Sequence, residues 1–324
     1  MVKIAVVGCG MWGRNIIRNA ASLDILAGVC DLNHQRADEF AKDFDTKALD
    51  FDAALSNKNI DGIMIATNAT THEALAIKAL DAGKHVYIEK PLAMSIAEAQ
   101  RISSKASNAQ KQVMVGHLIR YHAAFIEMQK QVQSGAIGQL RHIQANRLAM
   151  GRIRSTESVL FDLCPHDLSL ILSLAGAQPQ AVSCAGASHI TDGLVDILST
   201  TLSFPNKITA MMQTSWMSPY KEHRLTVSGT KGSLVFDDTK SWPEKLTLYQ
   251  DNMSQAGDIF VVERASPIAL PVPESEPLKE EVKAFAQVCA TGMAAPTDMA
   301  EALLVQEVLE MMTDALQDMN NPTP

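Results

Sequence analysis

The sequence predicts an α/β protein with two domains: a parallel, doubly wound sheet comes first and a mostly antiparallel sheet follows. Two observations lead to this prediction. Short apolar runs alternate with helix-like segments up to about residue 118, as in a parallel sheet covered by helices. Beyond that point strand-like runs follow one another without helices between them, which indicates antiparallel pairing. A chain of 324 residues is also longer than one ordinary core requires.

The first domain, residues 1–118, is expected to alternate strand and helix throughout. The expected strands are 3–8, 25–31, 60–67, 85–89 and 113–117, and the expected helices are 14–22, 34–43, 71–82 and 95–108. The fourth strand should stop at Lys90, because Pro91 has no N–H for a sheet ladder and favours an extended residue before it. In such sheets ligands bind at the carboxyl ends of strands, where Lys90 would stand.

The second domain, residues 119–324, opens with a helix and then becomes rich in strands. Helices are expected at 121–133, 162–174, 278–290 and 298–316, and strands at 140–150, 181–189, 196–204, 208–217, 223–228 and 233–236. Gly229-Thr230-Lys231-Gly232 should join the last two strands as a hairpin. Residues 242–277 contain five prolines and are expected to form an extended excursion.

Composition restricts the partners and the compartment. The net charge of −8 argues against nucleic-acid and anionic-membrane partners. Five cysteines form no CxxC pair, and the nine histidines show no metal-ligand spacing, so we expect no zinc site and no disulfide framework. The absence of a signal segment and of an apolar run of about 18 residues predicts a cytoplasmic protein.

A glycine-rich turn after the first strand predicts a dinucleotide site. Gly8 permits the tight turn, Gly10 lets a pyrophosphate approach the backbone, and Gly13 lets helix and strand pack closely. Asp31 ends the second strand, where a carboxylate accepts hydrogen bonds from the adenosine ribose and repels a 2′-phosphate. We therefore expect NAD, although His34 and Arg36 lie nearby. The cofactor-binding candidates are Gly8, Gly10, Met11, Trp12, Gly13, Asp31, Thr67, Asn68, His72, Glu89 and Lys90.

Two further groups of residues carry the expected chemistry. Lys90, beside Glu89, is placed to bind or protonate a substrate oxygen. Asp162 and His166 are four residues apart, so a carboxylate can orient an imidazole, although Asp167 is an alternative partner and a surface pair is an alternative interpretation. Arginine side chains suit diphosphates. The substrate-binding candidates are Lys90, His117, Arg120, Tyr121, Arg152, Arg154 and His166.

The combined motifs resemble one known family over nearly the whole chain. Gly8-x-Gly10-x-x-Gly13, Glu89-Lys90-Pro91 and Asp162-x-x-x-His166, in this order, are similar to those of the Gfo/Idh/MocA oxidoreductases. The resemblance implies an N-terminal Rossmann domain and a C-terminal domain whose large open sheet forms homodimers or homotetramers. It also implies that Lys90, Asp162 and His166 match the family's catalytic positions.

A narrower likeness points to a substrate class. Gly116 to His122, Gly151-Arg152-Ile153-Arg154 and Pro165-His166-Asp167 look like the members that act on nucleotide sugars, and most like UDP-N-acetylglucosamine 3-dehydrogenases. That subgroup often has Trp-Ser-Phe-Ala where this chain has Phe161-Asp162-Leu163-Cys164. Oxidation of a sugar hydroxyl is the expected reaction, with His166 or Lys90 as the base. A UDP-sugar acid, a free cyclitol or an aldose, the reverse reduction, and a non-catalytic dinucleotide-binding regulator remain alternatives.

Overall fold

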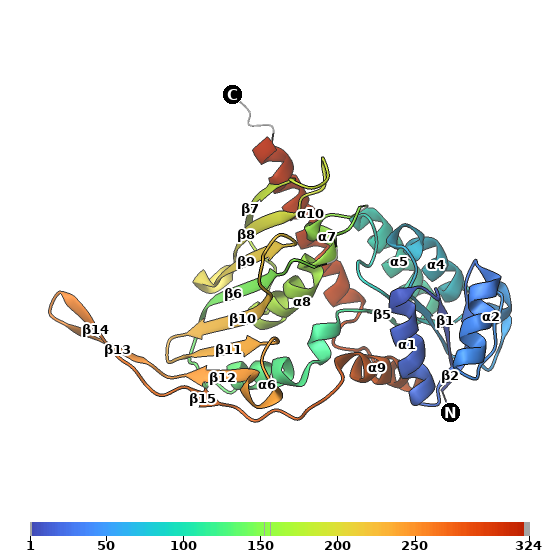
Figure 1. Ribbon diagram of the computed structural model, residues 1–324, viewed down its shortest axis with the longest axis horizontal. Helices are drawn as coiled ribbons and strands as arrows, with labels where there is room; N and C mark the ends of the chain where they lie inside the picture. Colours follow the sequence, from blue (N-terminus) through green and yellow to red (C-terminus); the bar gives the residue numbers. More distant parts are fainter. Residues whose placement is uncertain (1, 152, 156, 321–324) are drawn as a thin grey trace. The chain divides into compact units, whose positions relative to one another are not determined.

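The computed structural model describes residues 2–151, 153–155 and 157–320, which divide into two compact units (Figure 1). Unit 1 comprises the chain up to residue 121 together with residues 276–307, and unit 2 comprises residues 122–275 and the chain from residue 308 onward. The expected second domain, residues 119–324, is therefore divided between the two units. The chain returns to unit 1 through a helix that the sequence places far from the first domain.

Unit 1 contains a five-stranded parallel sheet with the strand order β2-β1-β3-β4-β5. Its strands are β1 (Ile4–Val7), β2 (Leu26–Cys30), β3 (Gly62–Ile65), β4 (His85–Ile88) and β5 (Val113–Val115). The connecting helices are α1 (Met11–Ser22), α2 (His34–Asp43), α3 (Phe51–Ser56), η1 (Ala69–Thr71), α4 (His72–Asp81), α5 (Ile96–Ala109) and η2 (Leu118–Tyr121). The predicted doubly wound parallel sheet is confirmed. The short α3 has no counterpart among the expected elements, and the short turns η1 and η2 lie almost entirely outside them.

The helix α9 (Pro277–Thr291) completes the core of unit 1. Leu278, Val282, Phe285 and Val288 recur at helical spacing, and all four are buried in the same cluster as Tyr87 of β4. The ring of Phe285 lies 5.8 Å from that of Tyr87. This apolar stripe explains why the chain returns to the first sheet. The last helix, α10 (Met299–Asn320), follows.

Unit 2 is built on an eight-stranded sheet with the order β15-β12-β11-β10-β6-β9-β8-β7. The strands are β6 (Leu140–Leu148), β7 (Ala181–Ala187), β8 (Ile197–Ser203), β9 (Thr209–Ser215), β10 (Glu222–Gly229), β11 (Ser233–Asp237), β12 (Leu246–Tyr249) and β15 (Ile268–Ala269). Apart from the parallel pair β6 and β9, all neighbours are antiparallel, as predicted. The expected hairpin is confirmed by the pairing of Ser228 with Ser233.

The helices of unit 2 differ from the expectation at one place. They are α6 (Ala123–Gln133), α7 (Val159–Asp162), α8 (Cys164–Ala175), η3 (Pro205–Lys207) and η4 (Trp242–Glu244). The single helix expected over residues 162–174 is interrupted at Leu163, so that Asp162 ends α7 and His166 lies in the first turn of α8. Pro165 lies in the first turn of α8, where no intrahelical hydrogen bond needs its missing N–H. In the interior of one longer helix the same proline would break the backbone hydrogen bonding, so the helix is interrupted before it.

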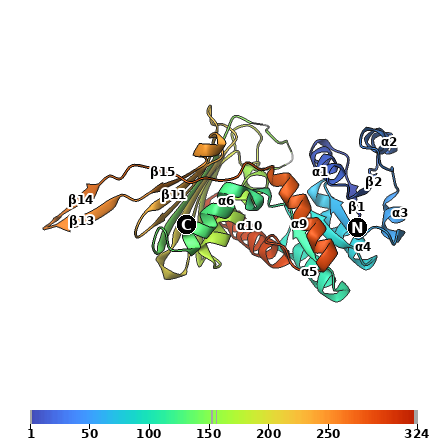
Figure 2. The same cartoon turned by 90° about the horizontal axis from the view of Figure 1, so that it is seen from below.

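The expected extended excursion contains a two-stranded ribbon. β13 (Asn252–Ala256) and β14 (Ile259–Glu263) pair only with each other, and the ribbon extends away from the eight-stranded sheet in both views (Figures 1 and 2). Ile259, Phe260 and Val262 of this ribbon are exposed.

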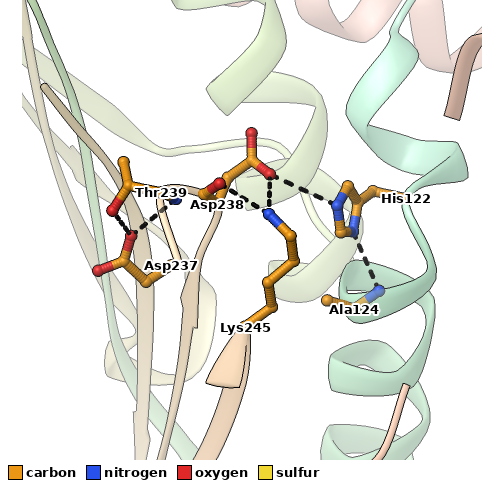
Figure 3. A network of polar contacts seen from close by, with 6 residues as sticks. All are labelled: His122, Ala124, Asp237, Asp238, Thr239 and Lys245. Carbon is orange, nitrogen blue, oxygen red and sulfur yellow. Dashed lines mark hydrogen bonds and ion pairs between the residues drawn. The ribbon is translucent and has the colours of Figure 1, made fainter. Parts of the chain in front are cut away.

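A polar network links the start of α6 to the segment between β11 and β12 (Figure 3). His122 accepts a hydrogen bond at Nδ1 from the Ala124 N–H, which leaves Nε2 facing the Asp238 carboxylate at 3.5 Å. Lys245 donates to the same carboxylate at 2.7 Å, and the His122 ring stacks on Trp242. The cation and the two rings therefore fix the first residues of unit 2.

Candidate active site

The glycine turn between β1 and α1 has the shape that a pyrophosphate needs. Gly8 has a φ of +102°, and a Cβ there would lie 2.5 Å from the Ala66 carbonyl oxygen. A Cβ on Gly13 would lie 1.9 Å from the Gly8 carbonyl oxygen. A Cβ on Gly10 would meet no atom within 4 Å, so the backbone at the N-terminus of α1 is open to a ligand. These residues fit a dinucleotide phosphate.

Asp31 is fixed at the end of β2, next to the glycine turn. One carboxylate oxygen accepts a hydrogen bond from the Cys9 N–H at 2.8 Å, and the other accepts one from the Asn33 N–H at 2.8 Å. The guanidinium of Arg36 lies 3.6 Å away. Each carboxylate oxygen keeps a second lone pair with which it can accept a ribose hydroxyl.

The residues after β3 form a tightly bonded turn. The hydroxyls of Thr67 and Thr71 lie 2.7 Å apart, and Thr71 donates to the carbonyl of Asn68. His72 is only 1% exposed, and its ring nitrogens lie 2.8 Å from the Pro91 carbonyl and 3.2 Å from the Thr67 carbonyl. Burial lowers the pKa of His72, and the neutral ring can donate its one N–H to only one of these two carbonyls.

Glu89 and Lys90 stand where β4 ends. Glu89 accepts hydrogen bonds from the Trp12 indole at 2.6 Å and from the Tyr87 hydroxyl at 2.7 Å. The Lys90 N–H donates to the other Glu89 oxygen at 3.2 Å. Glu89 therefore connects the glycine turn, through Trp12, to the residue that carries the proposed chemistry. Met11 and Trp12 are exposed at the start of α1.

The residues after β5 are bound to the returning C-terminal segment of unit 1. His117 Nδ1 lies 2.7 Å from the Glu301 carboxylate, and Arg120 lies 3.7 Å from the same group. The Tyr121 hydroxyl lies 2.9 Å from Thr297 Oγ1, and its ring is buried in the core. Within unit 1 these three candidates therefore hold η2 in place.

Unit 2 contains a hollow of about 560 Å³ at one end of the sheet. It is lined by Arg147, Ala149, Met150, Gly151, Arg154, Asp162, Leu163, Ser215, Trp216, Pro219, Lys221 and His223. Most of these residues follow the ends of β6 and β9 or precede the start of β10. The predicted residue Arg152 lies outside the described residues, while Arg154 and Asp162 face the hollow.

Two ion pairs set the charge around this hollow. Arg147 donates two hydrogen bonds to Asp167, at 2.7 and 2.9 Å, so its charge is balanced by a bidentate partner. Arg154 lies 3.3 Å from Asp162. Asp167 is therefore committed to Arg147. His166, which is partly exposed on α8, lies one residue from that pair.

Lys221 and His223 were not among the expected site residues. They precede and begin β10, and alternation along a strand places both on the side that lines the hollow. Burial, followed by the charges of Arg147 and Lys221, lowers the pKa of His223 to about 4, so the ring is neutral at physiological pH. The Lys-x-His spacing was visible in the sequence, but only the sheet brings it beside Arg154.

Comparison with known families covers most of the chain. Residues 2–117 match the family described as "Oxidoreductase family, NAD-binding Rossmann fold", and residues 125–235 match the "GFO/IDH/MocA C-terminal domain". The chain belongs to the Gfo/Idh/MocA family of oxidoreductases. The predicted resemblance is confirmed, and the NAD-binding fold agrees with the open glycine turn of unit 1.

Individual relatives of this Gfo/Idh/MocA protein act on sugars and cyclitols. The UDP-N-acetylglucosamine 3-dehydrogenase of Acidithiobacillus ferrooxidans is 35% identical over 193 residues, which are 59% of this chain and 60% of that protein. The scyllo-inositol 2-dehydrogenase (NAD(+)) of Bacillus subtilis is 27% identical over 72% of this chain and 73% of its own. A solved structure of UDP-N-acetylglucosamine 3-dehydrogenase GnnA from A. ferrooxidans is similar with a TM-score of 0.85, at 26% identity, over 98% of both chains. The first alignment spans less than two thirds of that relative's length.

Two negative findings concern the described residues. None of the described helices is both long and apolar enough to cross a membrane. Residues 2–151, 153–155 and 157–320 contain no group of three or more histidine, cysteine or acidic side chains arranged to hold a metal ion.

Proposed function

We propose that this protein is an NAD-dependent dehydrogenase that oxidises a secondary hydroxyl of a nucleotide sugar, with the 3-hydroxyl of UDP-N-acetylglucosamine as the first candidate. The observation that carries the proposal is the basic hollow of unit 2 in a protein of net charge −8. Lys221 and Arg154 line it. Asp167 balances Arg147 and Asp162 lies 3.3 Å from Arg154, so Lys221 is the cation of the hollow without an ion-pair partner among the described residues. An uncompensated lysine beside the Arg154 guanidinium suits a diphosphate. The relatives named above support the sugar.

The catalytic roles are proposed from the family motifs. NAD, when bound, accepts a hydride from the alcohol carbon. His166 takes the proton of the hydroxyl, Asp162 orients the imidazole, and Lys90 donates a hydrogen bond to the reacting oxygen and stabilises its developing negative charge. Lys90 belongs to unit 1 and His166 to unit 2. Substitution of each residue tests whether both take part in the reaction. We expect Lys90→Ala and His166→Asn each to lower kcat by about 10²- to 10⁴-fold.

The cofactor contacts are also proposed residue by residue. Gly8, Gly10, Met11, Trp12 and Gly13 would hold the pyrophosphate, and Asp31 would accept the ribose hydroxyls and select NAD over NADP. Thr67, Asn68, His72, Glu89 and Lys90 would form the nicotinamide side. Asp31→Ala should therefore lower the ratio of kcat/KM for NAD to that for NADP. An unchanged ratio would contradict the assignment of Asp31.

A homodimer or homotetramer formed through the unit 2 sheet belongs to the same proposal. On β8 and β9 the exposed side chains are Ser199, Thr201, Ser203, Thr209, Met211 and Gln213. These six side chains of β8 and β9 carry no charge, and Met211 is the one large apolar side chain among them, so a second sheet can approach closely at these two strands. Light scattering should give at least twice the monomer mass, and Met211→Lys should weaken the association.

The substrate is tested by following NADH absorbance with a panel of alcohols. The panel contains UDP-N-acetylglucosamine, its C6 acid, myo-inositol, scyllo-inositol and glucose, and the reverse reduction is assayed with the corresponding ketones. We expect the highest kcat/KM with a UDP-sugar and a loss of it in Lys221→Ala. If the protein oxidises only a cyclitol in this panel, the proposed nucleotide-sugar substrate is wrong and the cyclitol is the substrate. NAD binding without turnover of any alcohol would favour a regulator.

A further inference from the structure

A buried cluster beneath the end of β4 has no role in the site as described so far. Glu281 of α9 is 0% exposed, and its Oε2 lies 3.1 Å from the Tyr87 hydroxyl oxygen. The same hydroxyl lies 2.7 Å from Glu89. Two carboxyl groups therefore share one phenol in the core of unit 1. A Cβ on Gly116 would lie 2.5 Å from the Tyr87 hydroxyl and 2.9 Å from Glu89, so the cluster is closely packed.

The number of protons fixes the direction of these hydrogen bonds. A phenol has one O–H and can donate to only one of the two carboxyls. Burial raises the pKa of Glu89, but the hydrogen bonds that it accepts from the Trp12 indole and the Lys90 N–H act in the opposite direction and favour its ionised form. Glu281 has no such donors among the described residues, and its Oε1 has no hydrogen-bond partner there. The arrangement is satisfied when Glu281 is protonated and donates to Tyr87, while Tyr87 donates to Glu89.

The described cations on the neighbouring elements pair with other acids, so they do not stabilise an ionised Glu281. On α1, Arg18 pairs with Glu276 and Arg14 pairs with Asp43. On η2, Arg120 faces Glu301 and the Tyr121 hydroxyl bonds to Thr297. On α9 itself, Lys283 pairs with Glu280 at the surface. Burial, and then the charge of Glu89, hold the pKa of Glu281 well above its usual range.

We propose that Glu281 is a positioning residue that stays protonated at neutral pH and donates a hydrogen bond to the Tyr87 oxygen. The Tyr87 hydroxyl then donates its own hydrogen bond to Glu89. The chain of donors keeps the negative charge of the cluster on Glu89, next to Lys90. An ionised Glu89 attracts the neighbouring Lys90 ammonium group, which donates hydrogen bonds. This consequence for catalysis rests on the proposed function, whereas the proton on Glu281 does not.

The first test measures stability against pH without any substrate. A carboxyl whose pKa is higher in the folded than in the unfolded protein contributes stability at low pH, and this contribution is lost as the pH rises through the folded value. Glu281→Gln keeps the donor and the shape but cannot ionise. From about pH 5 upward, the folding equilibrium constant of Glu281→Gln should rise relative to that of the wild type by about tenfold per pH unit.

Glu280→Gln is the matched control for this measurement. Glu280 precedes Glu281 on α9 but is partly exposed and paired with Lys283. Its stability curve should run parallel to that of the wild type from pH 5 to pH 9. Parallel curves for Glu281→Gln as well would overturn the proposal, because they would mean that Glu281 is ionised in the folded protein.

The second test asks whether Glu281 acts through Tyr87. Glu281→Leu removes the donor and should lower kcat about tenfold with little change in KM, while Glu281→Gln retains most of kcat. In a Tyr87→Phe background, Glu281→Leu should have no further effect on kcat. Additive effects of the two substitutions would overturn the coupling. If Glu281→Leu does not fold, the comparison of Glu281→Gln with Tyr87→Phe tests the same donor chain.

The two experiments separate this inference from the proposed function. If the stability of Glu281→Gln diverges from that of the wild type with pH but the protein oxidises no sugar, the protonation of Glu281 is supported and only the proposed substrate is contradicted. Sugar oxidation together with parallel stability curves would reject the inference alone.

Discussion

Unit 2 places cations against the buried Asp167 and the half-buried Asp238, whereas unit 1 places two buried glutamates on one phenol. Asp167 receives two hydrogen bonds from Arg147, and Asp238 contacts both Lys245 and His122 (Figure 3). The side chain of Glu281 in unit 1 contacts only the Tyr87 hydroxyl among the hydrogen-bonding groups of the described residues. The same chemical group is thus buried in two electrostatic environments within one chain.

The pKa shifts follow from this difference. Burial acts to raise the pKa of Asp238, but the contacts with His122 and Lys245 outweigh burial and hold it below the usual range. In Glu281 burial and the neighbouring carboxylate act in the same direction, and the pKa rises. A cation within hydrogen-bond distance therefore favours the charged form of Asp238, whereas Glu281, which has no such cation among the described residues, keeps its proton.

The largest effect should follow from removing one partner of the ion pair between Arg147 and Asp167. Asp167→Ala leaves a buried guanidinium without its bidentate acceptor, and we expect a loss of about 3–5 kcal/mol in the free energy of unfolding. Urea denaturation measures this loss. The double substitution Arg147→Met with Asp167→Leu should recover most of it, since no charge is then left buried. A loss below about 1 kcal/mol, the usual value of a surface pair, would contradict the comparison.

A smaller effect is expected at Lys245, which is 8% exposed and faces an aspartate that is partly open to water. Lys245→Met removes the cation and its two hydrogen bonds to Asp238, and should lower the free energy of unfolding by about 1–3 kcal/mol. Thermal unfolding at neutral pH measures the change. Lys240→Met, an exposed lysine in the same loop, serves as the control.

Asp238 should also give unit 2 a pH dependence opposite in sign to that of Glu281. Its folded pKa is depressed, so its stabilising contribution is present above the unfolded value of about 3.9 and is lost as the pH falls through the folded value. Acid titration of unfolding should therefore be shallower in Asp238→Asn than in the wild type. Equal acid slopes in the two proteins would show that the His122 and Lys245 contacts do not stabilise the charge.

The packing of the unit 1 cluster is tested at Gly116. The added Cβ of Gly116→Ala meets a fully buried tyrosine hydroxyl, and we expect a loss of about 1–3 kcal/mol in the free energy of unfolding. The Tyr87 ring cannot move away easily because it packs on Phe285. The same denaturation assay applies. An unchanged stability would mean that the cluster is loosely packed.

The smallest effect on stability is expected at Gly10. An added Cβ meets no atom there, whereas an added Cβ at Gly13 meets the Gly8 carbonyl. Gly10→Ala should change the free energy of unfolding by less than about 1 kcal/mol and weaken NAD binding, measured by calorimetry. Gly13→Ala should destabilise the fold even without cofactor. Unaltered NAD affinity in Gly10→Ala would remove Gly10 from the proposed phosphate site.

Local patterns in the sequence predicted most of the fold. The alternation of apolar runs and helices gave the parallel sheet, and the uninterrupted strands gave the antiparallel one, because both patterns depend on neighbours along the chain. The glycine turn, Asp31 and the strand end at Lys90 were predicted for the same reason. The break between Asp162 and His166 was marked by Pro165, yet the four-residue spacing favoured a continuous helix.

The sequence by itself determined the family, the order of the elements and the residues at the carboxyl ends of the first strands. The tertiary structure decided that α9 returns to unit 1, that Asp167 binds Arg147, and that Lys221 and His223 line the hollow beside Arg154. It also decided that Glu281 meets Tyr87, a residue 194 positions away in the sequence. Local backbone conformation depends on adjacent residues, whereas the charge state of a buried acid depends on which distant side chains the fold brings to it.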